Sequence, residues 1–70
     1  MSDRLVNALK TARTRLGWTQ ADLAVRVSVS RKTINTVENG VFTPSVTLAL
    51  RLAAALGEPV ESLFRLEGGV

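Results

Sequence analysis

The segment from Thr19 to Gly40 constrains the fold of this chain more than any other part of it. Thr19, followed three residues later by Asp22, is a capping-box pattern and predicts the start of a helix. The apolar stripe predicted for this helix consists of Leu23, Ala24 and Val27. The small residues Ser28-Val29-Ser30 then predict a tight turn, so the segment should form two short helices held close together.

The second helix of this segment is predicted from Arg31 to Asn39, with Ser30 as its N-cap and Asn39-Gly40 as its end. Ile34 and Val37 should face the core. The opposite face carries four polar residues, namely Arg31, Lys32, Asn35 and Thr36. A short helix that is held by its partner and presents such a face suits insertion into the major groove of DNA.

The residues before this segment predict one more helix, from about Asp3 to Leu16. Leu5, Leu9, Ala12 and Leu16 recur there at helical spacing. Gly17 follows directly, where a residue in the left-handed conformation commonly ends a helix.

The residues after the segment predict two further helices and no strand. Thr43-Pro44 should cap and open a helix from about Ser45 to Leu56, which Gly57 ends. Pro59 should open a last short helix through Val60, Leu63 and Phe64, and Gly68-Gly69 should be a frayed tail. No segment shows a clear alternation of apolar and polar residues, so we expect five helices and an all-α domain.

Composition narrows the function. Seventy residues suffice for one domain, 1–70. The chain contains no cysteine and no histidine, which excludes disulfides and leaves only carboxylates as metal ligands, so we expect no metal or other cofactor. General acid–base catalysis would depend on six scattered carboxylates, and the five glycines form no phosphate loop, so we expect no enzyme. Without a membrane-length apolar run or a leader pattern, we expect a cytoplasmic protein.

Charge is unevenly distributed along the chain. Residues 1–35 hold seven basic and two acidic side chains, for +5, whereas residues 36–70 hold two basic and four acidic ones, for −2. Such polarity favours a polyanion at one end of the domain, although an ordinary solvated surface accounts for it equally well.

From Arg13 to Phe64 the chain resembles the Cro/C1-type (XRE-like) helix-turn-helix regulators. The matching positions are Gly17, Thr19-Gln20, Leu23-Ala24, Val29-Ser30-Arg31, Thr33-Ile34, Glu38-Asn39-Gly40, Pro44-Ser45, Ala53, Leu56-Gly57 and Leu63-Phe64. The resemblance implies a five-helix, lambda-repressor-like DNA-binding domain whose second and third helices form the helix-turn-helix motif, at about 19–40. Three positions depart from the family pattern: Ser28 replaces a glycine, Val41 a basic residue, and Pro59 a serine or threonine cap.

Two sets of residues are candidates for DNA contact, with a solvated helix face as the alternative. Arg31, Lys32, Asn35 and Thr36 are predicted to contact bases, with arginine suited to guanine, asparagine to adenine and threonine to a thymine methyl. The resemblance implies that Gln20, Ser30, Thr33 and Asn39 contact the DNA backbone. For Ser30, its position as an N-cap is a sufficient explanation without DNA.

Two further residues are predicted to be structural. The resemblance implies an ion pair between Arg13 and Glu38 that joins the first helix to the end of the third. Trp18 more simply covers the core than stacks on a base, because no other aromatic residue lies near it in the sequence.

The helix predicted at Ser45–Leu56 is apolar on nearly every side, which exceeds what one core contact requires. A self-complementary dimer surface would use Leu48, Leu52, Ala55, Val60, Leu63, Phe64 and Leu66. The alternative is deeper burial within one chain. A dimer would place two recognition helices about 34 Å apart and imply a palindromic operator.

These observations favour a double-stranded DNA-binding regulator, most simply a repressor. A restriction–modification controller protein is a close variant of that function. An antitoxin-like subunit, which binds a toxin or another protein partner and regulates its own operon, is the alternative from a different class.

Overall fold

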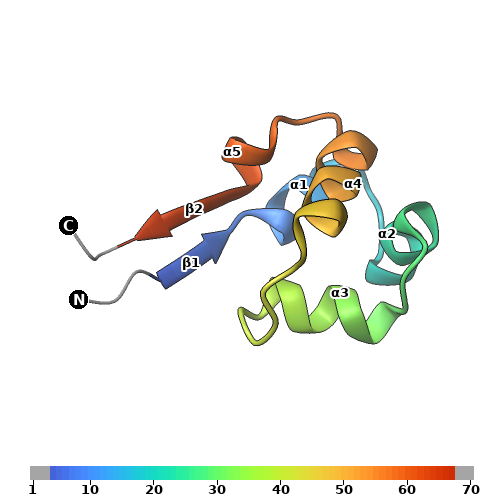
Figure 1. Ribbon diagram of the computed structural model, residues 1–70. Coiled ribbons are helices and arrows are strands. Elements are labelled where there is room, and N and C mark those ends of the chain that lie inside the picture. The colour runs from blue at the N-terminus through green and yellow to red at the C-terminus, as the bar shows by residue number, and fades with distance from the viewer. Residues whose placement is uncertain (1–3, 68–70) are drawn as a thin grey trace.

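The computed structural model describes residues 4–67 and has a helical body extended by a two-stranded sheet (Figure 1). The elements in chain order are β1 (Arg4–Asn7), α1 (Leu9–Arg15), α2 (Gln20–Val27), α3 (Arg31–Glu38), α4 (Val46–Leu56), α5 (Val60–Leu63) and β2 (Phe64–Glu67). The five predicted helices are present. The expectation of a strictly all-α fold is wrong, because β1 and β2 pair at one end of the body.

The helix-turn-helix segment is built from the local signals that its sequence carries. Thr19 Oγ1 accepts a hydrogen bond from the Asp22 backbone N–H at 3.0 Å, and Asp22 Oδ2 accepts from the Thr19 backbone N–H at 2.8 Å. The capping box therefore exists as predicted. The hydrogen bond from the Thr19 backbone N–H to the carboxylate, and after it the interaction with the Thr19 side chain, hold the pKa of Asp22 below its ordinary value. Ser28 ends α2 in the left-handed conformation with φ 61°, and Ser30 caps α3 through the Thr33 N–H at 3.1 Å.

The first helix is shorter than predicted because residues 4–7 form a strand. Asn7 Oδ1 accepts from the Leu9 N–H at 3.2 Å, and Asn7 Nδ2 donates to the Val37 carbonyl at 2.9 Å, which fixes the start of α1 at Leu9. β1 pairs antiparallel with β2, with Arg4 opposite Glu67 and Asn7 opposite Phe64. Leu16, predicted to be in the apolar stripe of the helix, lies beyond its end and is exposed.

The C-terminal elements also differ at their ends from the prediction. Ser45, and not Thr43, is the N-cap of α4, since its side chain accepts from the Leu48 N–H at 3.1 Å. α5 ends at Leu63, and Phe64 turns to extended backbone and begins β2. The frayed tail predicted at Gly68-Gly69 lies outside the described residues.

The core lies between α1, α2, α3 and α4, with α5 closing one side. Its fully buried large side chains are Leu9, Leu23, Val27, Ile34, Val37, Leu52 and Leu63. Among the helices of residues 4–67, none has the length and apolar character needed to cross a bilayer.

Burial within one chain corrects part of the predicted dimer surface. Leu48, Leu52 and Leu63 belong to the core, so these three have no surface to offer a partner. α4 is apolar on several sides because it is a central helix that packs against α2 and α5. Of the remaining predicted residues, Ala55, Val60 and Phe64 are half-buried and Leu66 is 64% exposed.

Candidate nucleic-acid interface

One face of α3 is anchored in the core and the opposite face is open to solvent. Ile34 and Val37 are fully buried, and α3 packs closely against α2. Arg31, Lys32 and Asn35, all predicted to contact bases, are exposed along the helix, and Thr36 is half-buried beside them. The fold therefore brings the four predicted base-contacting residues together on one rigid helix that stands at the edge of the body (Figure 1).

The positive charges on this face of α3 have no carboxylate partner in the described part of the chain. Arg4, Arg13 and Arg15 have carboxylate partners in Glu67, Glu38 and Glu58. Across residues 4–67, neither Arg31 nor Lys32 forms an ion pair or a side-chain hydrogen bond. Of the basic residues in the first half of the sequence, Arg31 and Lys32 therefore lie unpaired at the exposed end of α3, where they are free to attract an anion.

A buried ion pair holds α1 to the end of α3, as predicted. Arg13 Nε donates to Glu38 Oε2 at 2.7 Å, and Arg13 Nη2 donates to Glu38 Oε1 at 3.1 Å. The side chains are only 9% and 3% exposed, and Arg13 Nη1 also donates to the Trp18 carbonyl at 2.8 Å. The hydrogen bonds to Glu38 raise the pKa of Arg13 above its ordinary value. Both residues belong to the scaffold that orients α3.

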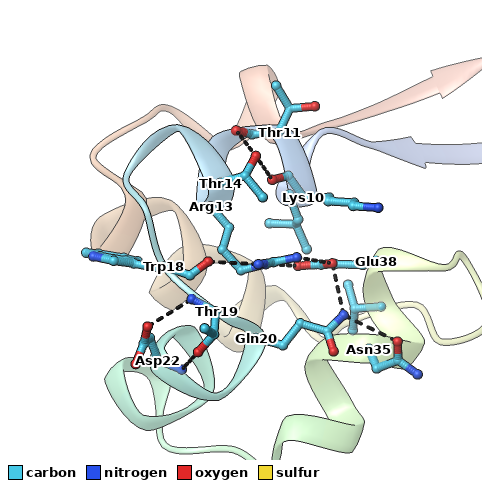
Figure 2. A network of polar contacts seen from close by, with 12 residues as sticks. Lys10, Thr11, Arg13, Thr14, Trp18, Thr19, Gln20, Asp22, Asn35 and Glu38 are labelled. Atoms are coloured by element: carbon cyan, nitrogen blue, oxygen red, sulfur yellow. Dashed lines mark hydrogen bonds and ion pairs between the residues drawn. The ribbon is translucent and has the colours of Figure 1, made fainter.

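A line of side-chain amides connects this ion pair to the exposed face of α3 (Figure 2). Gln20 Nε2 donates to Glu38 Oε1 at 3.1 Å and to Asn35 Oδ1 at 3.3 Å. Asn39 Nδ2 donates to the same Asn35 oxygen at 3.1 Å. Gln20 and Asn39, both predicted to contact phosphate, therefore also bind Asn35. No sequence signal indicates this network, because Gln20 and Asn35 are fifteen residues apart on different helices.

Hydroxyl groups line the start of α3. Ser30 Oγ accepts from the Thr33 N–H and lies 3.0 Å from Thr33 Oγ1. Thr36 Oγ1 donates to the Thr33 carbonyl at 2.9 Å, so its hydroxyl hydrogen is used within the helix. A hollow of about 370 Å³ beside the helix is lined by Lys32, Thr33, Thr36, Val41 and Phe42. Ser30 and Thr33 thus sit next to the basic end of α3, where the prediction places backbone contacts.

Trp18 is half-buried and packs against the core, as predicted. The guanidinium of Arg26 lies over its ring, 4.0 Å from the centroid, in a cation–π contact that the sequence did not indicate. The Arg26 side chain therefore packs on Trp18 within the domain.

Comparison with known proteins identifies the family. A helix-turn-helix family model matches residues 9–63, which is more than half of the chain. The chain belongs to the Cro/C1-type (XRE-like) helix-turn-helix family. An HTH-type transcriptional regulator from Methanothermobacter thermautotrophicus is 47% identical over 60 residues, which cover 84% of this chain and 87% of the relative.

Two other relatives add detail. The restriction-modification controller protein C.AhdI from Aeromonas hydrophila has a similar structure, with a TM-score of 0.74, 31% identity, and 77% of this chain and 82% of that chain covered. The antitoxin HipB from Escherichia coli O6:H1 is 34% identical over 53 residues, or 76% of this chain, but these span only 56% of the antitoxin. The family consists of DNA-binding transcriptional regulators and is not a class of enzymes.

Proposed function

We propose that the protein binds double-stranded DNA in a sequence-specific manner through α3 and acts as a transcriptional repressor by covering a promoter. The observation that carries this proposal is the exposed face of α3. Arg31 and Lys32 lie there without a carboxylate partner in the described part of the chain, on a helix whose other face is fixed in the core. A rigid helix with free cations at its N-terminal end suits the major groove.

The proposed contacts divide into two kinds. Arg31, Lys32, Asn35 and Thr36 contact base edges, and Thr36 uses its methyl group, since its hydroxyl hydrogen is bonded to Thr33. Backbone contacts come from Ser30, Thr33 and Asn39, and from the backbone N–H of Gln20 at the start of α2, because both hydrogens of the Gln20 side-chain amide are used by Glu38 and Asn35.

Selection from a pool of random duplexes, followed by sequencing, tests the proposal. Arg31→Ala should weaken binding to the selected site by about 1–3 kcal/mol and relax the preference at one base pair. Arg65→Ala removes the same charge from β2, far along the chain from α3, and serves as the matched control. Failure to enrich any sequence, or equal losses in both variants, would contradict sequence-specific binding by α3.

We further propose that the protein binds a palindromic operator as a homodimer. The exposed Leu66, together with the half-buried Val60 and Phe64, supplies apolar surface at the C-terminal end of the body. Leu66→Asp should then give a folded monomer in sedimentation experiments, whereas Leu63→Asp should unfold the chain because Leu63 is buried. A selected site without inverted symmetry, or a wild type that is monomeric at micromolar concentration, would argue against the dimer.

A second candidate is an antitoxin-like subunit or a restriction–modification controller. The similarity to the antitoxin HipB and to C.AhdI favours it. In either case the chain would still bind DNA. An antitoxin would in addition bind a toxin as its protein partner. The neighbouring gene distinguishes them: a toxin gene whose product forms a stable complex with this chain supports the antitoxin, and restriction and methyltransferase genes support the controller.

A further inference from the structure

The side-chain oxygen of Asn35 is already fully used within the protein. Gln20 Nε2 and Asn39 Nδ2 both donate to Asn35 Oδ1, at 3.3 Å and 3.1 Å. A carboxamide oxygen has two lone pairs, so two donors saturate it. What remains for a ligand is the NH₂ group of Asn35, whose hydrogens meet no acceptor within residues 4–67, on an exposed position of α3.

Glu38 determines which way these amides point. A carboxylate paired with arginine can only accept hydrogen bonds, so Gln20 must present its NH₂ group to Glu38 Oε1, at 3.1 Å. The second hydrogen of the same NH₂ group then needs an acceptor, and Asn35 Oδ1 supplies it. Rotating the Asn35 amide by half a turn would place its NH₂ group against the NH₂ group of Gln20, which Glu38 holds in place. The order of donors and acceptors therefore runs from the buried ion pair outward to the surface (Figure 2).

We infer that Asn35 distinguishes keto from amino base edges in the major groove. Its NH₂ group donates to guanine O6 and N7 or to thymine O4. At adenine it finds a single acceptor, N7, beside the competing donor N6, and at cytosine it meets only the donor N4, so both amino bases are disfavoured. This inference rests on the proposed function. It replaces the expectation that Asn35 contacts adenine, because a bidentate adenine contact requires both the oxygen and the NH₂ group of the asparagine.

Gln20 and Asn39 are positioning residues in this scheme. They do not supply the discrimination themselves but hold the Asn35 oxygen away from the groove. If one of them is removed, the oxygen regains a free lone pair and the amide can rotate to present an acceptor as well as a donor. Adenine then becomes an acceptable partner, so the base preference reports on the network.

The first arm of the test uses duplex selection with the wild type, Asn35→Ala and Asn35→Asp. Asn35→Ala identifies the base pair at which preference is lost. At that pair the wild type should prefer guanine or thymine on the contacted strand by roughly tenfold or more, the usual discrimination of a good base contact. Asn35→Asp replaces the outward donor by an acceptor, so it should reverse the preference to cytosine or adenine while binding all sites more weakly, because it adds a negative charge facing the phosphates.

The second arm uses Gln20→Met, which keeps the length of the side chain but removes both donors. The preference at the Asn35 base pair should move toward adenine, and the preference at the base pair lost in Arg31→Ala should stay unchanged, because Arg31 lies outside the network. Asn39→Ala, at an exposed position, removes the other donor and should act in the same direction even if Gln20→Met folds poorly.

The outcomes separate this inference from the proposed function. If the wild type enriches no sequence, the proposed function fails, and the inference with it. If the wild type enriches a site but prefers adenine at the Asn35 pair, the inference alone is wrong. It is also wrong if Asn35→Ala weakens all sequences equally, which would indicate a phosphate contact, or if neither Gln20→Met nor Asn39→Ala shifts the preference.

Discussion

The Arg13–Glu38 ion pair should decide whether the domain folds at all. The two side chains are 9% and 3% exposed, so removing one leaves the other charge buried without a partner. Such a loss costs about 3–5 kcal/mol. A domain of this size has a total stability of only about 3–5 kcal/mol from its core. Glu38→Ala should therefore be largely unfolded at 25 °C, as measured by far-UV circular dichroism and urea titration.

Replacing both partners tests the reasoning behind this expectation. Arg13→Met combined with Glu38→Leu removes the two charges together, and such exchanges of a buried pair are often neutral or stabilising. Two further hydrogen bonds are lost, from Arg13 to the Trp18 carbonyl and from Gln20 to Glu38, at about 1 kcal/mol each. The free energy of unfolding of the double variant should therefore lie within about 1–2 kcal/mol of the wild-type value and well above the value of either single variant.

An exposed ion pair of the same chain is the matched control. Arg4 and Glu67 are 76% and 46% exposed, so solvent screens their attraction and Glu67→Ala should leave the unfolding curve almost unchanged. The reasoning is refuted if Glu38→Ala loses less than about 1 kcal/mol, or if the double variant is no more stable than the single ones.

Three other predictions concern stability. Ser28→Gly should raise the free energy of unfolding by about 0.5–1 kcal/mol, because relief of the left-handed conformation exceeds the entropy that glycine adds to the unfolded chain; thermal unfolding measures this. The pKa of Asp22 is lowered in the fold, so its carboxylate contributes fully to the stability of the fold above the ordinary pKa of about 3.9, and this stability is lost as the pH falls through the lowered value. The difference in melting temperature between the wild type and Asp22→Asn should therefore shrink between pH 6 and pH 2. Leu52→Ala should cost about 2–5 kcal/mol in urea titration, since Leu52 is fully buried, and a loss below 1 kcal/mol would mean that α4 does not pack as described.

The parts of the fold that the sequence predicts correctly are those with local signals. The capping box at Thr19 and Asp22 and the N-cap at Ser30 lie within three residues of the backbone groups they bind, so their pattern is visible in the sequence. The paired strands β1 and β2 have no such signal, since their partners are about sixty residues apart. The alternation of Phe64, Arg65, Leu66 and Glu67 is consistent with a strand, but four residues also fit one turn of a helix.

The candidate site shows the same limit. The exposed face of α3 follows from helical periodicity, because Ile34 and Val37 fix which side is buried. The hydrogen bonds that use the Asn35 oxygen depend on how α2 and α3 pack, which no spacing in the sequence specifies. The predicted dimer surface includes three residues that are buried within the chain, Leu48, Leu52 and Leu63, for a related reason. Apolar residues on many sides of a helix indicate burial, but not whether the covering surface belongs to the same chain.

Glu38 links the stability of the domain to the orientation of the amide that faces the groove. Its carboxylate accepts from Arg13 and from Gln20, and Gln20 in turn orients Asn35. The double variant Arg13→Met with Glu38→Leu separates the two roles, because it restores the fold but gives Gln20 no carboxylate to bind. In duplex selection this folded variant should lose the keto preference at the Asn35 base pair and keep the preference due to Arg31. Retention of both preferences would mean that Asn39 alone suffices to orient Asn35, and that the buried ion pair serves stability only.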